Sequence, residues 1–236
     1  MTHLDINTGQ IVANAAASER TSFIRRTYLH VAGAFMIFAL LEAALIKAGI
    51  GEQMMSVLAT SKYSWLIVLG AFMFVSYLAN NWAHSSLSRE KQYLGLGIFI
   101  VAEAIIFLPL IYMAAVYAPD ILRQAAIATI ALTVGITFTA FTTKKDFSFL
   151  GPILGIGGMI ALGLIVASII FGFTLGLVFS GAMVIFAAGA ILYSTSNVMH
   201  SYHTEQHVAA ALSLFASIAL MFWYILQFLM SLSGEE

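Results

Sequence analysis

The chain has 236 residues, of which 61% are hydrophobic and 9% are charged, and its formal net charge is −1. Because soluble domains carry about 25% charged residues, this composition excludes a soluble globular domain and predicts a membrane protein. The near-neutral charge and the lack of a basic patch argue against nucleic acid as a partner, and the lack of cysteine excludes disulfides and thiol chemistry.

The first segment in chain order, residues 1–26, is polar. It lacks the apolar core of about 7–15 residues that defines a secretory signal peptide. We therefore expect a polar, flexible cytoplasmic tail over residues 1–26 and a membrane domain over residues 27–236.

The rest of the chain consists of long apolar runs separated by short connectors. A helix that crosses the hydrocarbon core needs about 20 predominantly apolar residues. Seven candidate spans meet this requirement: Tyr28–Ala48, Trp65–Ala83, Tyr93–Tyr117, Ile121–Phe141, Phe149–Phe171, Thr174–Val198 and Val208–Leu232. The boundary at Gly172–Phe173 is the least distinct, because the apolar character is almost continuous there. A break at this point gives the seven spans that we favour, and six is the alternative.

Lysine and arginine predict the orientation, because they concentrate on the cytoplasmic side of membrane proteins. With seven spans and a cytoplasmic amino terminus, the cytoplasmic side holds Arg20, Arg25, Arg26, Arg89, Lys91, Lys144 and Lys145. The external side holds Lys47, Lys62 and Arg123. We therefore expect the amino terminus in the cytoplasm and the carboxyl terminus outside.

The fifth span is rich in glycine, at positions 151, 155, 157, 158 and 163. Small residues at such spacings allow helix backbones to approach closely. We interpret the fifth span as a tightly packed interior helix.

Two acidic residues lie inside spans. Glu103 is close to the middle of the third run, and Glu42 lies nearer the external end of the first, shortly before Lys47. A carboxyl group in hydrocarbon is either protonated or has a polar or cationic partner. Each residue is therefore either part of a proton or cation pathway or a protonated structural acid. Both interpretations stay open for Glu103, whereas the structural one is favoured for Glu42 because interfacial water is within reach.

Hydroxyl side chains are aligned at helical spacing on two spans. Thr129, Thr133 and Thr137 lie on the fourth, and Ser213 and Ser217 lie on the seventh. They either line a hydrated path or hydrogen-bond neighbouring helices, which is the interpretation we favour. Neither set provides the clustered carboxylate oxygens of a tight calcium site.

The connector before the last span carries His200, His203 and His207 around Glu205. In a continuous helix these histidines could share one face, as in a metal site. Ser201 and its polar neighbours predict a turn instead, so we expect a histidine-rich loop without a metal, or alternatively a pH-responsive cluster. Because no nucleophile–base pair, phosphate loop or zinc-protease motif is visible, the sequence predicts neither an enzyme nor a cofactor.

Two stretches resemble signatures of the Bax inhibitor-1 family. The stretch FTTKKDFSFLGPIL at 141–154 is similar to the signature between the family's fourth and fifth spans, and it includes Lys144, Lys145, Asp146 and Phe147. The stretch GAILYSTSNVMH at 189–200, which includes Asn197, is similar together with AALSLFASIALMFWYIL to the family's final two helices. The resemblance is specific from about Phe141 onward and is strongest to the bacterial YccA branch.

The resemblance implies an all-α membrane protein of the bacterial inner membrane, a seven-transmembrane-helix bundle with the last helix enclosed by the other six. It also implies two activities. Some members are proton-sensitive calcium leaks that use an aspartate in helix six paired with one in helix seven, whereas the YccA-like branch binds and restrains the membrane-anchored AAA protease FtsH. The two aspartate positions correspond here to Ser194 and Ser217, so the titratable pair is absent.

We therefore expect a modulator that binds FtsH, with a proton-sensitive calcium or cation leak through Glu103 as the alternative. Because a processive protease needs an unfolded segment to begin, we expect FtsH to engage the tail over residues 1–26 and to stall on the packed bundle.

Overall fold

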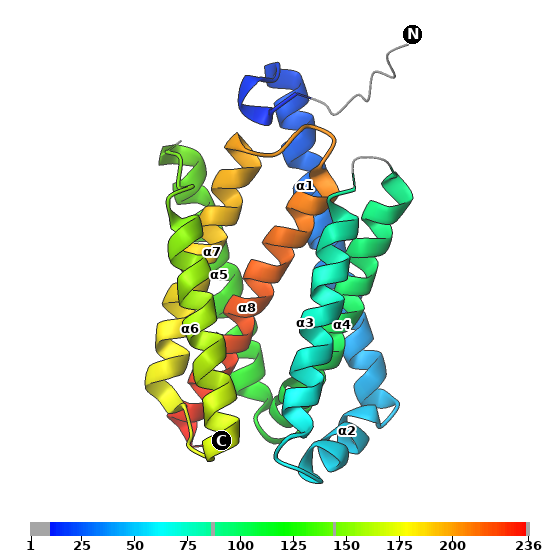
Figure 1. The fold of residues 1–236 in the computed structure, drawn as a ribbon, viewed down its shortest axis with the longest axis vertical. Coiled ribbons are helices and arrows are strands. Elements are labelled where there is room, and N and C mark those ends of the chain that lie inside the picture. The colour runs from blue at the N-terminus through cyan, green and yellow to red at the C-terminus, as the bar shows by residue number, and fades with distance from the viewer. Residues whose placement is uncertain (1–9, 86–87, 144, 235–236) are drawn as a thin grey trace.

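The computed structural model describes residues 10–85, 88–143 and 145–234, and within these residues it contains helices and no β-strand (Figure 1). A single 3-10 turn, η1 (Val12–Asn14), comes first. The helices that follow are α1 (Ala17–Lys47), α2 (Ile50–Ala59), α3 (Ser64–Ala83), α4 (Arg89–Tyr117), α5 (Pro119–Thr143), α6 (Leu150–Phe171), α7 (Gly176–His200) and α8 (His207–Ser233).

Seven of these helices, all except the short α2, are long and apolar enough to cross a membrane. The prediction of an all-α membrane protein with seven spans is confirmed. The six-span alternative fails because α6 ends at Phe171 and α7 begins only at Gly176. Gly172 adopts φ +75°, and its N–H bonds the carbonyl of Ser168 at 2.8 Å. Glycine adopts this left-handed conformation without a steric penalty, so it ends the helix there.

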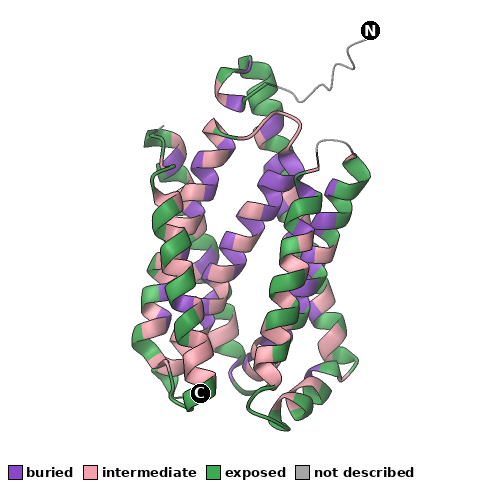
Figure 2. Cartoon of the chain, in the orientation of Figure 1, coloured by how far each residue is buried: buried purple, intermediate pink, exposed green. Residues whose placement is uncertain are grey.

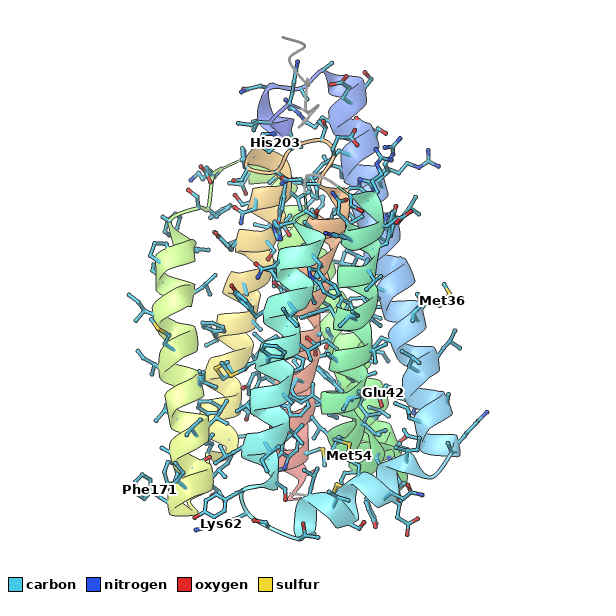
Figure 3. The ribbon with its side chains drawn as sticks, turned by 45° about the vertical axis from the view of Figure 1, so that its right-hand side comes forward. Met36, Glu42, Met54, Lys62, Phe171 and His203 are labelled. Atoms are coloured by element: carbon cyan, nitrogen blue, oxygen red, sulfur yellow. The ribbon has the colours of Figure 1, made fainter. Side chains whose placement is uncertain are left out.

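The connectors between the helices lie at the two ends of the bundle. At one end, called here the amino-terminal end, lie residues 10–14 and the connectors α3–α4, α5–α6 and α7–α8. At the opposite end lie α2, the connectors α4–α5 and α6–α7, and the end of α8. Figure 3 places His203 at the amino-terminal end and Lys62 and Phe171 at the opposite end.

The bundle is arranged around α8, which runs through its centre (Figure 1). In its most apolar 18-residue window 72% of the residues are buried, compared with 6% for α6. It packs against α1, α3, α4, α5 and α7, and Figure 2 shows buried residues along most of its length. Alanines and serines at 209–211, 213, 216, 217 and 219 keep its surface small, which allows several helices to approach one helix closely.

The interpretation of the fifth span as an interior helix is wrong. α6 packs mainly against α7 and lies at the periphery of the bundle. A Cβ atom added at Gly151 or Gly157 would come within 3.1 Å of Tyr193 or 3.0 Å of Phe186, both on α7. Gly155 and Gly163 have no neighbouring heavy atom within 4 Å of such a Cβ. The glycines therefore serve a single contact with α7 and do not indicate burial on all sides.

The tightest approach at a described glycine lies elsewhere, between α3 and α4. A Cβ atom added at Gly95 would lie 2.5 Å from the carbonyl oxygen of Ala79 and 2.7 Å from the backbone nitrogen of Ala83. Ala79 and Ala83 are fully buried at this crossing. Small side chains on both helices thus let the two backbones meet.

Residues 10–26 are folded and do not form the flexible tail that we expected. α1 begins at Ala17 and not at Tyr28, so its first turns extend the helix beyond the apolar run. Residues before it pair with the α7–α8 connector: the N–H of Val12 donates to the carbonyl of Tyr202 at 2.9 Å, and the N–H of Thr204 donates to the carbonyl of Gln10 at 3.0 Å. Residues 1–9 lie outside the described part of the chain.

Candidate functional site

Ser194 of α7 and Ser217 of α8 face each other in the interior of the bundle. Their hydroxyl oxygens are 2.9 Å apart, and the two residues are 6% and 8% exposed. Ser217 also donates to the carbonyl of Ser213, one helical turn earlier, at 2.9 Å. A hydroxyl has a single proton, so with this bond formed it is Ser194 that donates to Ser217. The two residues that the family resemblance aligns with an acid pair are thus brought together as a neutral hydrogen-bonded pair.

The same row of hydroxyls continues toward the amino-terminal end. The Tyr202 hydroxyl, in the α7–α8 connector, lies 2.8 Å from the hydroxyl oxygen of Ser213. Burial raises the pKa of Tyr202 above its ordinary value, against the smaller lowering effect of this hydrogen bond. Tyr202 is therefore a neutral phenol, and Ser213 and Ser217 act as bonds between α8 and its neighbours. Among the aligned threonines of α5, Thr129 differs, because it donates to the carbonyl of Ala125 in its own helix at 2.7 Å.

The family motif between α5 and α6 is tied to α7 through Ser196, a contact that we did not predict. The hydroxyl of Ser196 accepts from the N–H of Phe147 at 2.9 Å and donates to Asp146 at 3.5 Å. Asp146 also accepts from the N–H of Ser148 at 2.8 Å, and this backbone hydrogen bond is the main cause that holds the pKa of its carboxyl below the ordinary value. Asp146 therefore anchors the start of α6 as a carboxylate. The sequence signal for this contact was Ser196 itself, which lies two residues after Ser194 in the same polar stretch.

The other motif residues lie around this anchor. Lys145 is exposed, and Lys144 lies outside the described residues. Asn197 is in the last turn of α7, where its carbonyl accepts from the N–H groups of Ser201 and Tyr202 and closes the helix. These residues shape the α5–α6 and α7–α8 connectors at one end of the bundle and do not extend to Glu103 or Glu42.

The three histidines of the connector do not share a helix face. His200 ends α7, where its Nδ1 lies 3.0 Å from the carbonyl oxygen of Ser196. His203 lies in the connector beside residue 11. His207 is the first residue of α8 and faces His30 of α1, with ring centroids 5.1 Å apart. The break of the helix between His200 and His207 separates the side chains, because the connector turns there.

Tyr93 joins His30 and His207 into one cluster. Its hydroxyl is 3.2 Å from Nε2 of His30 and 3.5 Å from Nε2 of His207. Close by in the chain, Arg89 forms an ion pair with Glu205. The amino-terminal ends of α1, α4 and α8 are thus held by polar contacts between distant parts of the sequence, which no local sequence pattern had indicated.

The two acidic residues inside the spans have different surroundings. Glu42 of α1 is 4% exposed, and both carboxyl oxygens lack a hydrogen-bond partner among the described residues. It lies in the half of the bundle nearer α2 (Figure 3). Glu103 of α4 is 6% exposed and lines a cavity of about 680 Å³. Of these two acids, Glu103 is the one that lines this cavity.

The Glu103 cavity is lined by residues from α3, α4, α6, α7, α8 and the α6–α7 connector. Trp65, Phe173 and Ser231 contribute from the opposite end, and Glu103 contributes from the middle of α4. The cavity therefore extends from the opposite end to the middle of the bundle. Ala216, the neighbour of Ser217 in α8, also lines it, so the cavity reaches the same level of α8 as the serine pair.

These features define a polytopic helical membrane protein with a buried last span, a neutral serine pair and an internal cavity. The chain belongs to the Bax inhibitor-1 family, since residues 20–234 match the family model described as inhibitor of apoptosis-promoting Bax1.

The chain is similar to family relatives over almost its whole length. It is 25% identical to protein lifeguard 4 of Mus musculus over 228 residues, which are 95% of this chain and 91% of that protein. It is 24% identical to Bax inhibitor 1 of Schizosaccharomyces pombe over 230 residues, 95% of this chain and 82% of that protein. A shorter match, 30% identical over 118 residues, relates 50% of the chain to 53% of the protein PA2604 of Pseudomonas aeruginosa.

Proposed function

We propose that this protein is a bacterial inner-membrane member of the YccA-like branch that binds the membrane-anchored AAA protease FtsH and restrains it. The observation that carries the proposal is the hydrogen bond between Ser194 and Ser217. Two carboxylates that share a proton change charge with pH and can separate helices. Serine hydroxyls stay neutral, so the contact between α7 and α8 is independent of pH. A bundle without this switch is better suited to binding than to proton-gated conduction.

The amino-terminal end offers the surface for such a partner. Seven basic residues belong to this side and three to the other when counted over the sequence, which supports a cytoplasmic location. Arg20 donates to the carbonyls of Val12 and Ala13 at 3.1 and 2.7 Å and thereby fixes residues 12–14 against the start of α1. We propose that FtsH contacts this folded segment, residues 10–20, together with the α7–α8 connector.

The test is a binding assay between purified FtsH and the protein, each in nanodiscs. The wild type should bind, and Arg20→Ala should bind more weakly because it releases residues 12–14. Arg123→Ala is the matched control, since Arg123 is an exposed arginine at the opposite end that pairs with Asp120. An absence of wild-type binding would overturn the proposal, and equal losses in both variants would overturn the proposed surface.

A proton-sensitive calcium or cation leak is the second candidate, and one observation favours it: Glu103 lines a cavity. Flux measured in liposomes tests it directly. If ions pass through the cavity, Glu103→Gln should abolish the pH-dependent flux and Glu42→Gln should preserve it. No flux from the wild type, with FtsH binding retained, would leave the binding role as the function.

A further inference from the structure

The Glu103 cavity combines one acidic group with an aromatic lining. Seven of its lining residues are aromatic: Trp65, Phe72, Phe107, Phe173, Phe179, Trp223 and Tyr224. Glu103 is the only Asp, Glu, Lys, Arg or His side chain among the lining residues of the described chain. The cavity has therefore one potential negative charge and no basic side chain to neutralise it.

Glu103 is a buried acid that can pair with a positively charged ligand. It is 6% exposed, and no hydrogen bond or ion pair joins its carboxyl group to another described residue. A carboxylate removed from water is costly unless it is paired. An occupant with a positive charge would supply the missing partner, and an anionic occupant would be repelled.

The size and chemistry of the cavity select the kind of cation. Its volume, about 680 Å³, is in the range of about 300–1,000 Å³ that is typical of small-molecule sites. A calcium ion needs about six to eight oxygen ligands, and the described residues contain no cluster of three or more His, Cys, Asp or Glu side chains that could hold a metal. Aromatic faces instead attract organic cations through their π electrons.

The aromatic rings are held in place by their mutual packing. Trp223 contacts Phe107 with ring centroids 4.9 Å apart and Trp65 with centroids 6.5 Å apart, both at nearly perpendicular angles. Phe179 contacts Tyr224 at 6.0 Å. The lining extends to Phe173, which is 46% exposed, so the cavity reaches the surface at the opposite end. A ligand can therefore enter between the ends of α3 and α6–α7.

We propose that the Glu103 cavity is a binding site for lipophilic organic cations, with Glu103 as the counterion and the Trp65 and Trp223 rings as the aromatic contacts. The site is independent of the proposed FtsH binding, which uses the other end of the bundle.

The test uses tetraphenylphosphonium and tetraphenylborate, a cation and an anion of nearly the same shape. The protein in nanodiscs should bind radiolabelled tetraphenylphosphonium saturably at one site per chain, corrected for uptake by empty nanodiscs. It should show no saturable binding of tetraphenylborate. This comparison uses the wild type alone and does not depend on the folding of any variant.

Glu103→Gln should weaken the binding of tetraphenylphosphonium by about tenfold or more, because the counterion of a desolvated charge is lost. Glu42→Gln is the matched control, a buried acid that does not line the cavity, and it should retain the wild-type affinity. Trp82→Phe leaves Trp65 and Trp223 as the remaining tryptophans. In that variant, adding tetraphenylphosphonium should change the tryptophan emission with the same dissociation constant as the binding assay gives. This agreement would place the cation in the cavity.

Equal binding of the anion and the cation would overturn the proposal and identify a purely apolar cavity that takes hydrocarbon. Cation binding that survives Glu103→Gln, or that Glu42→Gln removes equally, would also overturn it. Binding of the cation without any change in the emission of the Trp82→Phe variant would place the site elsewhere.

Discussion

The serine pair between α7 and α8 gives an asymmetric prediction. Ser194 has its interhelical hydrogen bond with Ser217, whereas Ser217 also donates to the carbonyl of Ser213. Ser217→Ala therefore leaves a buried donor on α7, which costs about 1–3 kcal/mol. Ser194→Ala removes a donor, but Ser217 keeps its bond within α8, so its cost is about 0.5–1.5 kcal/mol. We expect Ser217→Ala to be the more destabilising change.

A double-mutant cycle isolates the bond itself. The free energy of unfolding in bicelles, measured for the wild type, both single variants and the double alanine variant, should give a coupling energy of about 0.6 kcal/mol, the average for interhelical hydrogen bonds in membranes. The double variant should lose less stability than the sum of the single variants. A coupling energy of zero would refute the hydrogen bond, and a larger cost for Ser194→Ala would refute the assignment of donor and acceptor.

The remaining predictions concern pH, an anchor and a helix crossing. The double variant with Ser194→Asp and Ser217→Asp should become less stable as the pH rises, because burial and proximity favour the protonated forms in the folded state; a pH-independent melting temperature would contradict this. Asp146, whose pKa is lowered in the fold, should stabilise the protein above its unfolded pKa and lose this contribution as the pH falls through the folded value. The melting temperature should therefore fall less on acidification in Asp146→Ala than in the wild type, and an equal fall would contradict this. Gly95→Ala should lower the free energy of unfolding by about 1–3 kcal/mol or more, because the added methyl group clashes with the α3 backbone. Gly97→Ala, where an added Cβ would meet no atom within 4 Å, should be neutral or stabilising by up to about 1 kcal/mol. Equal melting temperatures for the two variants would contradict the close crossing of α3 and α4.

The seven spans and the break between α6 and α7 could be predicted because their causes are local, whereas the start of α1 at Ala17 lies outside the apolar run and was missed. Apolar length alone separates the seven long helices from their connectors, and the break at Gly172 depends on the conformational freedom of one residue. α2 was missed because its 10 residues are too short for a span and were treated as a connector. Its position depends on tertiary contact, since Gly51 packs directly against the ring of Tyr112.

Burial could not be predicted with the same success, because it depends on which helices become neighbours. Glycine spacing in α6 indicated close packing, and the close packing exists at Gly151 and Gly157. The sequence does not state how many neighbours a helix has, and α6 has its main contact with α7. α8 has a lower mean hydropathy than α6, 2.1 compared with 2.5, yet α8 occupies the centre, where its small side chains face helices on several sides.

The candidate site also has features that could be predicted from the sequence and features that could not. The depth of Glu103 in α4 follows from its place in an apolar run, but the cavity beside it is formed by side chains from five helices, and no local pattern encodes such a volume. The pairing of Ser194 with Ser217 followed from the family resemblance, since two hydroxyls 23 positions apart carry no signal of their own.

The amino-terminal segment shows why a polar composition is an incomplete guide to flexibility. Residues 10–14 carry an apolar run of only three residues, yet their backbone pairs with that of residues 202–204, and Val12 is fully buried. Backbone hydrogen bonds are available to every residue, so such docking leaves little trace in composition. A protease that began at this segment would first have to break the contacts with Tyr202 and Thr204 and the bonds from Arg20. The segment is therefore better suited to form the folded surface that we propose for FtsH binding than to serve as an unfolded starting point for degradation.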